Sequence, residues 1–166
     1  YQKAEQILRE ALGIDPTDDG WSNLHHALFM QGKYEEDIKM MLQAFQANPD
    51  SRLILSLLYN GFWVREKWPE AQERFNDLIR KYPDNPDLFE YQARLYFNMG
   101  EKENDKQKSR EFFTEAIGYY DQAIKLMLNN RKYFGDELSL LLVWAEKGDA
   151  VYAWGGSFDD RDHRKK

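Results

Sequence analysis

The chain repeats a helical pattern about every 34 residues, and this period limits its fold more than any other feature of the sequence. Three stretches end at a proline, namely Pro16, Pro49 and Pro83. Proline cannot continue the hydrogen-bond ladder of a helix, so each of these prolines predicts a helix end. The apolar or small residues that precede them at matching positions are Leu8 and Ala11, Met41 and Ala44, and Phe75 and Leu78. A fourth copy keeps the pattern without a proline, at Tyr120, Ala123 and Leu128.

A second set of apolar residues lies between these helices and repeats with the same period. Its members are 34 residues apart: Trp21, Leu55 and Phe89 in one series, and Leu28, Phe62 and Tyr96 in another. Each period therefore predicts two helices. Gly32 and Gly100 are expected in the turns between paired helices, since glycine readily adopts the positive φ of a helix exit. The predicted helices are 18–31, 34–47, 52–65, 68–81 and 86–99.

A helix–turn–helix unit of about 34 residues resembles the tetratricopeptide repeat. The residues that carry the resemblance are Trp21, Leu24, Gly32, Tyr34, Met41, Ala44 and Pro49 in one unit, and Leu58, Trp68, Ala71, Phe75 and Pro83 in the next. The likeness extends over residues 1–128. It implies an all-α fold, a right-handed superhelical solenoid of antiparallel helix pairs, with about three and a half repeats and an irregular C-terminal helical cap.

Some positions depart from the family pattern. Met41 stands where an aromatic residue is usual, and Asp37 stands where a small alanine is expected. His25 and Tyr59 occupy a position of close helix contact where the family favours glycine or alanine, whereas Ala93 conforms. These departures predict loosened helix packing rather than a different fold.

The predicted domain covers residues 1–156, and residues 157–166 are predicted as a disordered tail because they lack hydrophobic periodicity. The predicted parts of the domain are a half repeat (1–16), two repeats (18–49 and 52–83), a repeat with an insertion at 101–111 (86–128) and a C-terminal helical cap (136–154). The half repeat resembles a second helix without its first helix. We therefore expect either a segment of a longer array or a chain whose missing N-terminus once covered that edge.

Two features of the C-terminal half leave the regular pattern. The insertion 101–111 is either a solvated loop or a backward extension of the next helix, and we favour an extension that starts near Asn104 or Asp105. Its eleven residues make about three helical turns, so an extension keeps the following apolar residues in phase. The run Leu140–Trp144 is apolar nearly all round, which predicts burial on more than one side, against residues 113–128 and against something outside this chain.

Composition and charge argue against several classes of function. The chain has no cysteine, which removes disulfides, thiolate metal sites and cysteine nucleophiles and is compatible with both the cytosol and the periplasm. The net charge of −6 opposes nucleic acid as a partner, because phosphate binding needs a basic surface. No apolar run approaches the roughly 18 residues of a membrane-spanning helix, and no signal peptide is visible.

The sequence predicts no catalytic residue, no metal site and no cofactor. His25 and His26 point about 100° apart on a helix, so they predict one histidine at the edge of the core and one on the surface. Glu35–Glu36 suits the first turn of a helix, where acidic residues favour the helix dipole, and Asp159–Asp160 lies in the polar tail. Acid–base catalysis needs two carboxylates across a cleft in different environments, and neither pair offers that.

The resemblance implies that the first helix of each repeat lines a concave face. Phe29, Trp63 and Phe97 are then expected at equivalent inward positions as apolar anchors, with Asn60 and Arg94 as polar selectors. The whole predicted partner-binding surface comprises His26, Phe29, Met30, Leu53, Ser56, Asn60, Trp63, Val64, Glu90, Arg94, Phe97 and Asn98. Two alternatives stay open: the aromatic residues belong to the core, or the long helix, the C-terminal segment or a second copy of the chain fills this face.

These expectations combine into a non-catalytic scaffold or adaptor that binds a protein or peptide segment in a concave groove. Relatives that grip the C-terminal carboxylate of heat-shock chaperones use a lysine, asparagine and arginine clamp. That activity is not expected here, because Ser22, Ser56 and Glu90 stand where a lysine is needed. The alternatives are a regulatory or sensor module of a larger protein with its catalytic domain elsewhere, and a scaffold that self-associates through uncapped ends. An RNA-binding helical repeat is opposed by the acidic charge.

Overall fold

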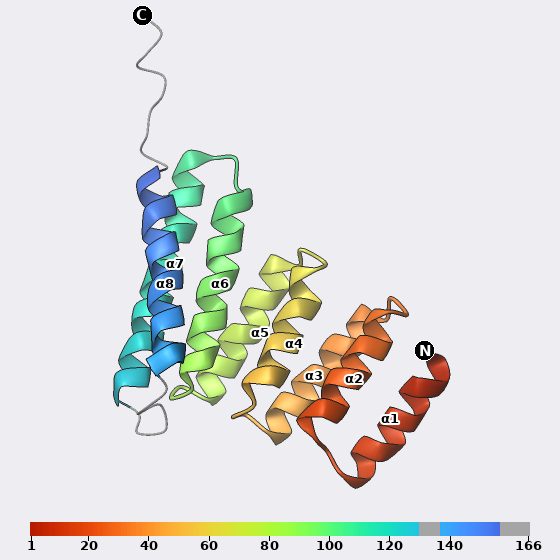
Figure 1. Cartoon of the computed structure of the whole chain (residues 1–166). Helices are drawn as coiled ribbons and strands as arrows, with labels where there is room; N and C mark the ends of the chain where they lie inside the picture. Colours follow the sequence, from red (N-terminus) through yellow and green to blue (C-terminus); the bar gives the residue numbers. More distant parts are fainter. Residues whose placement is uncertain (130–136, 157–166) are drawn as a thin grey trace, which may run out of the picture. The chain divides into compact units, whose positions relative to one another are not determined.

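The computed structural model describes residues 1–129 and 137–156, and within these ranges it contains helices and no strand (Figure 1). The helices are α1 (Gln2–Ile14), α2 (Asp18–Phe29), α3 (Tyr34–Ala47), α4 (Arg52–Trp63), α5 (Trp68–Lys81), α6 (Pro86–Lys102), α7 (Lys106–Asn129) and α8 (Glu137–Gly156). Residues 157–166, predicted as a disordered tail, and residue 136 at the start of the predicted cap lie outside the described residues.

The helices end close to the predicted positions. A proline follows each of α1, α3 and α5, two residues after the last helical residue: Pro16, Pro49 and Pro83. This agrees with the prediction that a proline cannot continue the hydrogen bonding of a helix. The first helices of the two regular repeats, α2 and α4, end at Phe29 and Trp63, two residues earlier than expected. The turn that reverses the chain begins there and takes up the remaining residues.

The period also sets where the first helices begin. Thr17, Ser51 and Asn85 are 34 residues apart, and each caps the helix that follows it. Their side-chain oxygens accept hydrogen bonds, at 3.0–3.2 Å, from a backbone N–H two or three residues further on. Such a cap satisfies one of the N–H groups that have no partner within the helix, and it stabilises the helix by about 1 kcal/mol.

The chain divides into two compact units, residues 1–71 (unit 1) and 72–166 (unit 2). In unit 1, α1 packs against α2, α2 packs against α3 and α4, and α3 packs against α4, with successive helices antiparallel (Figure 1). Their shared core consists of Leu12, Leu24, Leu28, Ile38, Met41, Phe45, Ile54, Leu58 and Phe62. A single helix as short as α1 is marginal in water, so it depends on this packing.

The turn after each first helix of unit 1 places one residue at positive φ. Gly32 has this conformation (φ 71°) after α2, which confirms its predicted place in a turn. At the equivalent position after α4 stands Glu66 (φ 52°), and it is the non-glycine residue with positive φ in the described chain. The same backbone bond closes both turns, because Lys33 N–H donates to the carbonyl of Leu28 and Lys67 N–H to that of Phe62.

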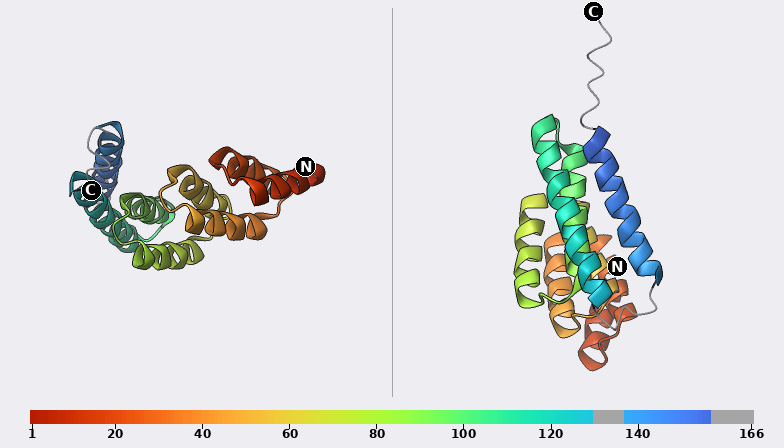
Figure 2. Two further views of the ribbon diagram at one scale, coloured as in Figure 1. Left: turned by 90° about the horizontal axis from the view of Figure 1, so that it is seen from below. Right: turned by 90° about the vertical axis from the view of Figure 1, so that its left-hand side faces the viewer.

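In unit 2, α6, α7 and α8 lie side by side (Figure 2). The C-terminal part of α5 packs against α6 through Phe75 and Tyr91, whose ring centroids are 6.4 Å apart. The core joins residues of α6, α7 and α8, namely Phe89, Ala93, Ala116, Tyr120, Ala123, Ile124, Met127, Val143 and Ala150.

The insertion lengthens both helices of the third pair. The predicted backward extension is confirmed, because α7 begins at Lys106 and Asp105 caps it by accepting from the N–H groups of Gln107 and Lys108 at 2.9 Å. The prediction that Gly100 ends a helix is wrong, because α6 continues to Lys102. A Cβ atom on Gly100 would lie 2.7 Å from the ring of Phe113, so glycine serves the close approach of α7 here.

The C-terminal helix α8 is covered on one side. It packs against α7, as predicted, and also touches α6, with Val143 and Ala150 fully buried. In the apolar run, Leu141, Leu142 and Trp144 are exposed. Within the described chain, burial of the run is therefore limited to one side of the helix, because α6 and α7 reach that side alone.

Candidate interaction surface

In unit 1 the predicted surface residues lie along α2 and α4, the first helices of two repeats, which pack against each other. The repeat relates them in pairs 34 residues apart: His26 and Asn60, Phe29 and Trp63, Met30 and Val64. On α4, Leu53 and Ser56 continue the stripe from Asn60 toward the N-terminus at spacings of three and four residues. Residues at these spacings share one face of a helix.

Large apolar side chains on this stripe are exposed. Four of them, with exposed fractions between 39% and 51%, are Met30, Leu53, Trp63 and Val64. Beside them His26 and Asn60 are exposed. We call these six residues the α2–α4 surface. It combines exposed apolar side chains with the polar side chains of His26 and Asn60.

The three predicted anchors have different surroundings. Phe29 is half-buried, with its ring centroid 5.2 Å from that of Tyr34 in α3. Phe97 is half-buried in the same way, 5.7 Å from the ring of Phe113 in α7. Both therefore pack on the second helix of their own pair. Trp63 is exposed and presents the largest aromatic side chain of the three to solvent.

The predicted residues of α6 are engaged within unit 2. Glu90 is fully buried and lies 2.9 Å from the guanidinium of Arg94. Arg94 Nε donates to Oε2 of Glu146 in α8 at 3.0 Å, and Asn98 Nδ2 donates to the backbone carbonyl of Arg94 at 2.7 Å. These contacts link α6 to α8.

Arg94 stays charged in this environment. Burial acts to lower its pKa, but the hydrogen bond to Glu146 and the charge of Glu90 outweigh burial and raise the pKa. Sequence reasoning did not anticipate Glu146 as a partner. The available signal was that Glu146 and Lys147 directly follow the apolar run 140–145, since charged groups beside buried apolar residues usually have a partner.

The acidic residues singled out in the sequence pair with basic residues of other segments. Glu35 forms an ion pair with Arg65, which lowers the pKa of Glu35. Glu36 accepts a hydrogen bond from Arg9 of α1 at 2.7 Å. Glu35 thus joins α3 to the turn after α4, and Glu36 joins α3 to α1. Asp159–Asp160 lies outside the described residues.

The two adjacent histidines separate as predicted. His25 is half-buried, whereas His26 is exposed and its ring centroid lies 5.9 Å from that of Tyr1. Within residues 1–129 and 137–156, no group of three or more histidine, aspartate or glutamate side chains is placed to hold a metal ion.

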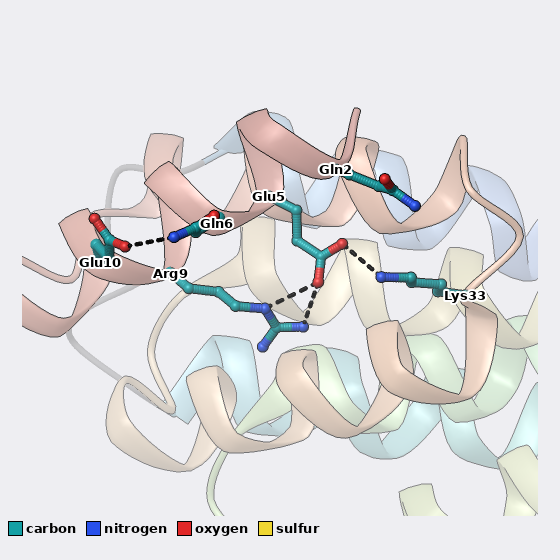
Figure 3. A pocket seen from close by; sticks show the side chains of 6 residues that line it. All are labelled: Gln2, Glu5, Gln6, Arg9, Glu10 and Lys33. Atoms are coloured by element: carbon teal, nitrogen blue, oxygen red, sulfur yellow. Dashed lines mark hydrogen bonds and ion pairs between the residues drawn. The ribbon is translucent and has the colours of Figure 1, made fainter.

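A polar pocket lies beside α1, and Figure 3 shows the side chains that line it: Gln2, Glu5, Gln6, Arg9, Glu10 and Lys33. Glu5 is buried and accepts hydrogen bonds from Lys33 at 2.8 Å, from Gln31 at 2.8 Å and from Arg9 at 3.0 Å. These donors hold the pKa of Glu5 at about 2. Because the central carboxylate is satisfied from within the chain, the pocket joins α1 to the turn before α3.

The arrangement of helices matches that of known repeat proteins. The structure of TTC0263, a thermophilic TPR protein of Thermus thermophilus, aligns with a TM-score of 0.51 and 17% sequence identity. The alignment covers 88% of this chain and 75% of that chain. The chain has the tetratricopeptide-repeat fold. The resemblance seen in the sequence is thereby confirmed for the fold, and the fold is all that this level of identity shows.

Two further solved structures align more loosely with this chain. MamA (residues 41 to its end) from Desulfovibrio magneticus RS-1 has 11% identity and a TM-score of 0.44, over 99% of this chain and 88% of that chain. A tetratricopeptide repeat protein from Parabacteroides merdae ATCC 43184 has 15% identity and a TM-score of 0.41, over 92% and 66%. The assignment of the fold rests on the first comparison.

No protein-family model matches the sequence, and no curated protein is similar to it. None of the described helices combines the length and the hydropathy that a bilayer crossing requires.

Proposed function

We propose that this chain is a non-catalytic protein-interaction scaffold that binds an uncharged, apolar peptide or protein segment on the α2–α4 surface. The observation that carries the proposal is the exposure of Met30, Leu53, Trp63 and Val64 on two helices that pack against each other. The repeat aligns these positions, so a partner segment that crosses α2 meets the same kind of side chain again on α4.

The chemistry of the α2–α4 surface favours a partner with apolar side chains. A half-exposed tryptophan such as Trp63 is a typical anchor, because its large rigid ring loses little conformational entropy when a partner covers it. His26 and Asn60 are exposed polar side chains beside the anchors, suited to hydrogen bonds with the backbone of an extended segment. None of these six residues carries a fixed charge. A strongly acidic or basic segment would therefore find no opposite charge on the α2–α4 surface.

A role in partner binding stays a prediction for four residues of α6: Glu90, Arg94, Phe97 and Asn98. Phe97 already contacts Phe113, and Asn98 donates to the α6 backbone. Arg94 pairs with both Glu146 and Glu90. We therefore base the proposed function on unit 1.

A peptide selection tests the proposal. A phage-displayed library of random peptides is selected on the immobilised chain, and the enriched peptides are measured by fluorescence anisotropy. We expect peptides with two or more large apolar residues, and we expect Trp63→Ala to weaken their binding about tenfold, as truncation of an anchor does. Ile14→Ala is the matched control, because Ile14 is 88% exposed on α1 and lies outside the α2–α4 surface.

Two results contradict the proposal. One is that Trp63→Ala binds the selected peptides as tightly as the original chain does. The other is that Trp63→Ala loses its helicity in circular dichroism, which would assign Trp63 to the core. The same surface serves an isolated scaffold and a regulatory module of a larger protein, and both remain within the proposed function. Self-association, the other alternative, is favoured by the exposed side of α8.

A further inference from the structure

The exposed side of α8 is an apolar stripe in unit 2. Its large members are Leu141, Trp144, Val151 and Tyr152, with exposed fractions between 45% and 83%. Their spacing along the helix is three, seven and one residues, which places them on one side. We call them the α8 face. An exposed apolar patch of this kind marks an interaction site more often than it marks an ordinary solvated surface.

Three charged residues lie in the middle of α8, outside this face: Glu146, Lys147 and Asp149. Asp149 is exposed and, as the residue next to Gly148, points about 100° away from it. Glu146 pairs with Arg94 of α6, and Lys147 pairs with Asp121 of α7. The Lys147 ammonium also lies 5.6 Å from the centroid of the Trp144 ring, at the border of the face. The α8 face itself is uncharged, so its partner must present an apolar, uncharged surface.

The two aromatic members of the α8 face lie at equal distances from Gly148. Trp144 lies four residues before this glycine and Tyr152 lies four residues after it. A Cβ atom on Gly148 would meet nothing within 4 Å, so the centre of the face is small and open. When two copies of α8 lie antiparallel with their glycines facing, Trp144 of each copy meets Tyr152 of the other. Aromatic pairs add about 0.5–1.5 kcal/mol to the area that they bury.

We propose that the α8 face binds the α8 face of a second copy of this chain, antiparallel and centred on Gly148. A two-fold interface uses the same patch on both subunits, and the arrangement of Trp144 and Tyr152 around Gly148 is self-complementary in that sense. Copies with a net charge of −6 repel each other, and an uncharged face is where they come together at the lowest electrostatic cost. The α8 face is distinct from the α2–α4 surface, so this proposal and the proposed function fail or hold separately.

Cysteine cross-linking tests the pairing directly, because the chain has no cysteine of its own. In the proposed dimer Gly148→Cys brings two identical thiols together, and a disulfide needs Cβ atoms about 4 Å apart. Gly118→Cys is the matched control. Gly118 lies in α7, is exposed, and likewise has nothing within 4 Å of an added Cβ.

Under copper phenanthroline at equal protein concentration, we expect Gly148→Cys to form a linked dimer about tenfold faster than Gly118→Cys, because pairing raises the effective thiol concentration. Equal rates for the two variants overturn the proposal, and so does the absence of a linked dimer with Gly148→Cys.

Light scattering over a concentration series gives a second measurement on the unlinked chain. We expect the molar mass to rise from 19.8 kDa toward twice that value. Trp144→Glu is expected to keep the chain monomeric, whereas Ile14→Glu, which alters an exposed apolar residue of α1, leaves the association unchanged. Loss of association in Ile14→Glu would place the interface on α1 and overturn the proposal. A monomer at every concentration overturns it as well.

Discussion

The Nδ1 atom of His25 in α2 lies 2.9 Å from Oδ2 and 3.0 Å from Oδ1 of Asp37 in α3. Asp37 is fully buried, and burial raises its pKa, with the histidine opposing that rise. Both residues stand where the family favours a small side chain. Taken singly each is a departure from the pattern, but together they form one polar contact in the place of two small residues. Gly61 of α4 completes the site, because an added Cβ would lie 3.5 Å from Asp37 Oδ2.

The two members of this pair are expected to be energetically coupled. His25→Ala leaves the buried carboxyl of Asp37 without its nearest polar partner, at a cost of about 2–3 kcal/mol in the free energy of unfolding. The double variant His25→Ala, Asp37→Ala buries no unpaired carboxyl and is expected to lose less than the sum of the single variants. Urea unfolding at neutral pH completes this double-mutant cycle. Strictly additive losses would show that the two side chains are not coupled.

Glu5 is expected to make unit 1 sensitive to acid. Its hydrogen bond from Lys33, with those from Gln31 and Arg9, lowers its pKa from 4.5 to about 2. A carboxyl whose pKa falls on folding stabilises the fold above pH 4.5, and that stability is lost as the pH falls from 4.5 toward 2.

We therefore expect Glu5→Gln to flatten the pH dependence of thermal unfolding below pH 4.5. Its effect is measured as the difference in Tm between the chain and the variant at neutral and at acidic pH. Glu10→Gln on the same helix is the control. A Glu5→Gln variant with the full acid dependence of the original chain would contradict the assignment.

Replacement of Glu66 by glycine is expected to stabilise the fold. Its φ of 52° is the left-handed conformation that Gly32 adopts at the equivalent position of the preceding repeat. A side chain in that region costs about 1 kcal/mol, because its Cβ crowds the following carbonyl oxygen. Glu66→Gly should raise the free energy of unfolding by up to about that amount. The mirror experiment, Gly32→Ala, should lower it, and equal signs for the two changes would refute this explanation.

The ion pairs that Arg94 and Lys147 form in unit 2 are expected to contribute unequally to the free energy of unfolding. Arg94→Met leaves the fully buried Glu90 without its cation, at a cost of about 3–5 kcal/mol. Glu146→Gln should cost less, because Arg94 keeps its contact with Glu90. The exposed pair of Lys147 and Asp121 is the control, and Lys147→Ala should cost less than about 1 kcal/mol. Chemical unfolding ranks the three variants, and equal losses would mean that burial of Glu90 does not set the order.

The equivalence of positions in the two regular repeats was predictable from the sequence. The period places Trp63 and Val64 where Phe29 and Met30 stand, at the ends of α4 and α2. Exposure was not predictable in the same way. Phe97 occupies the corresponding position in α6, yet it packs against Phe113, and Arg94 faces Glu146, which is 52 residues away in the chain. Periodicity predicts which residues occupy equivalent positions on a helix. It does not predict which distant segment of the chain covers those positions.

The sequence by itself determined the helices and their order. Pro16, Pro49 and Pro83 end helices and Thr17, Ser51 and Asn85 begin them, because each acts on backbone hydrogen bonds within a few residues of itself. The tertiary structure alone decided the partnership of His25 with Asp37, the need for Gly100 beside Phe113, and the division of α8 into a covered and an exposed side. These features depend on contacts between side chains of different helices. Such contacts follow from how helices pack, and a local pattern of apolar residues does not specify them.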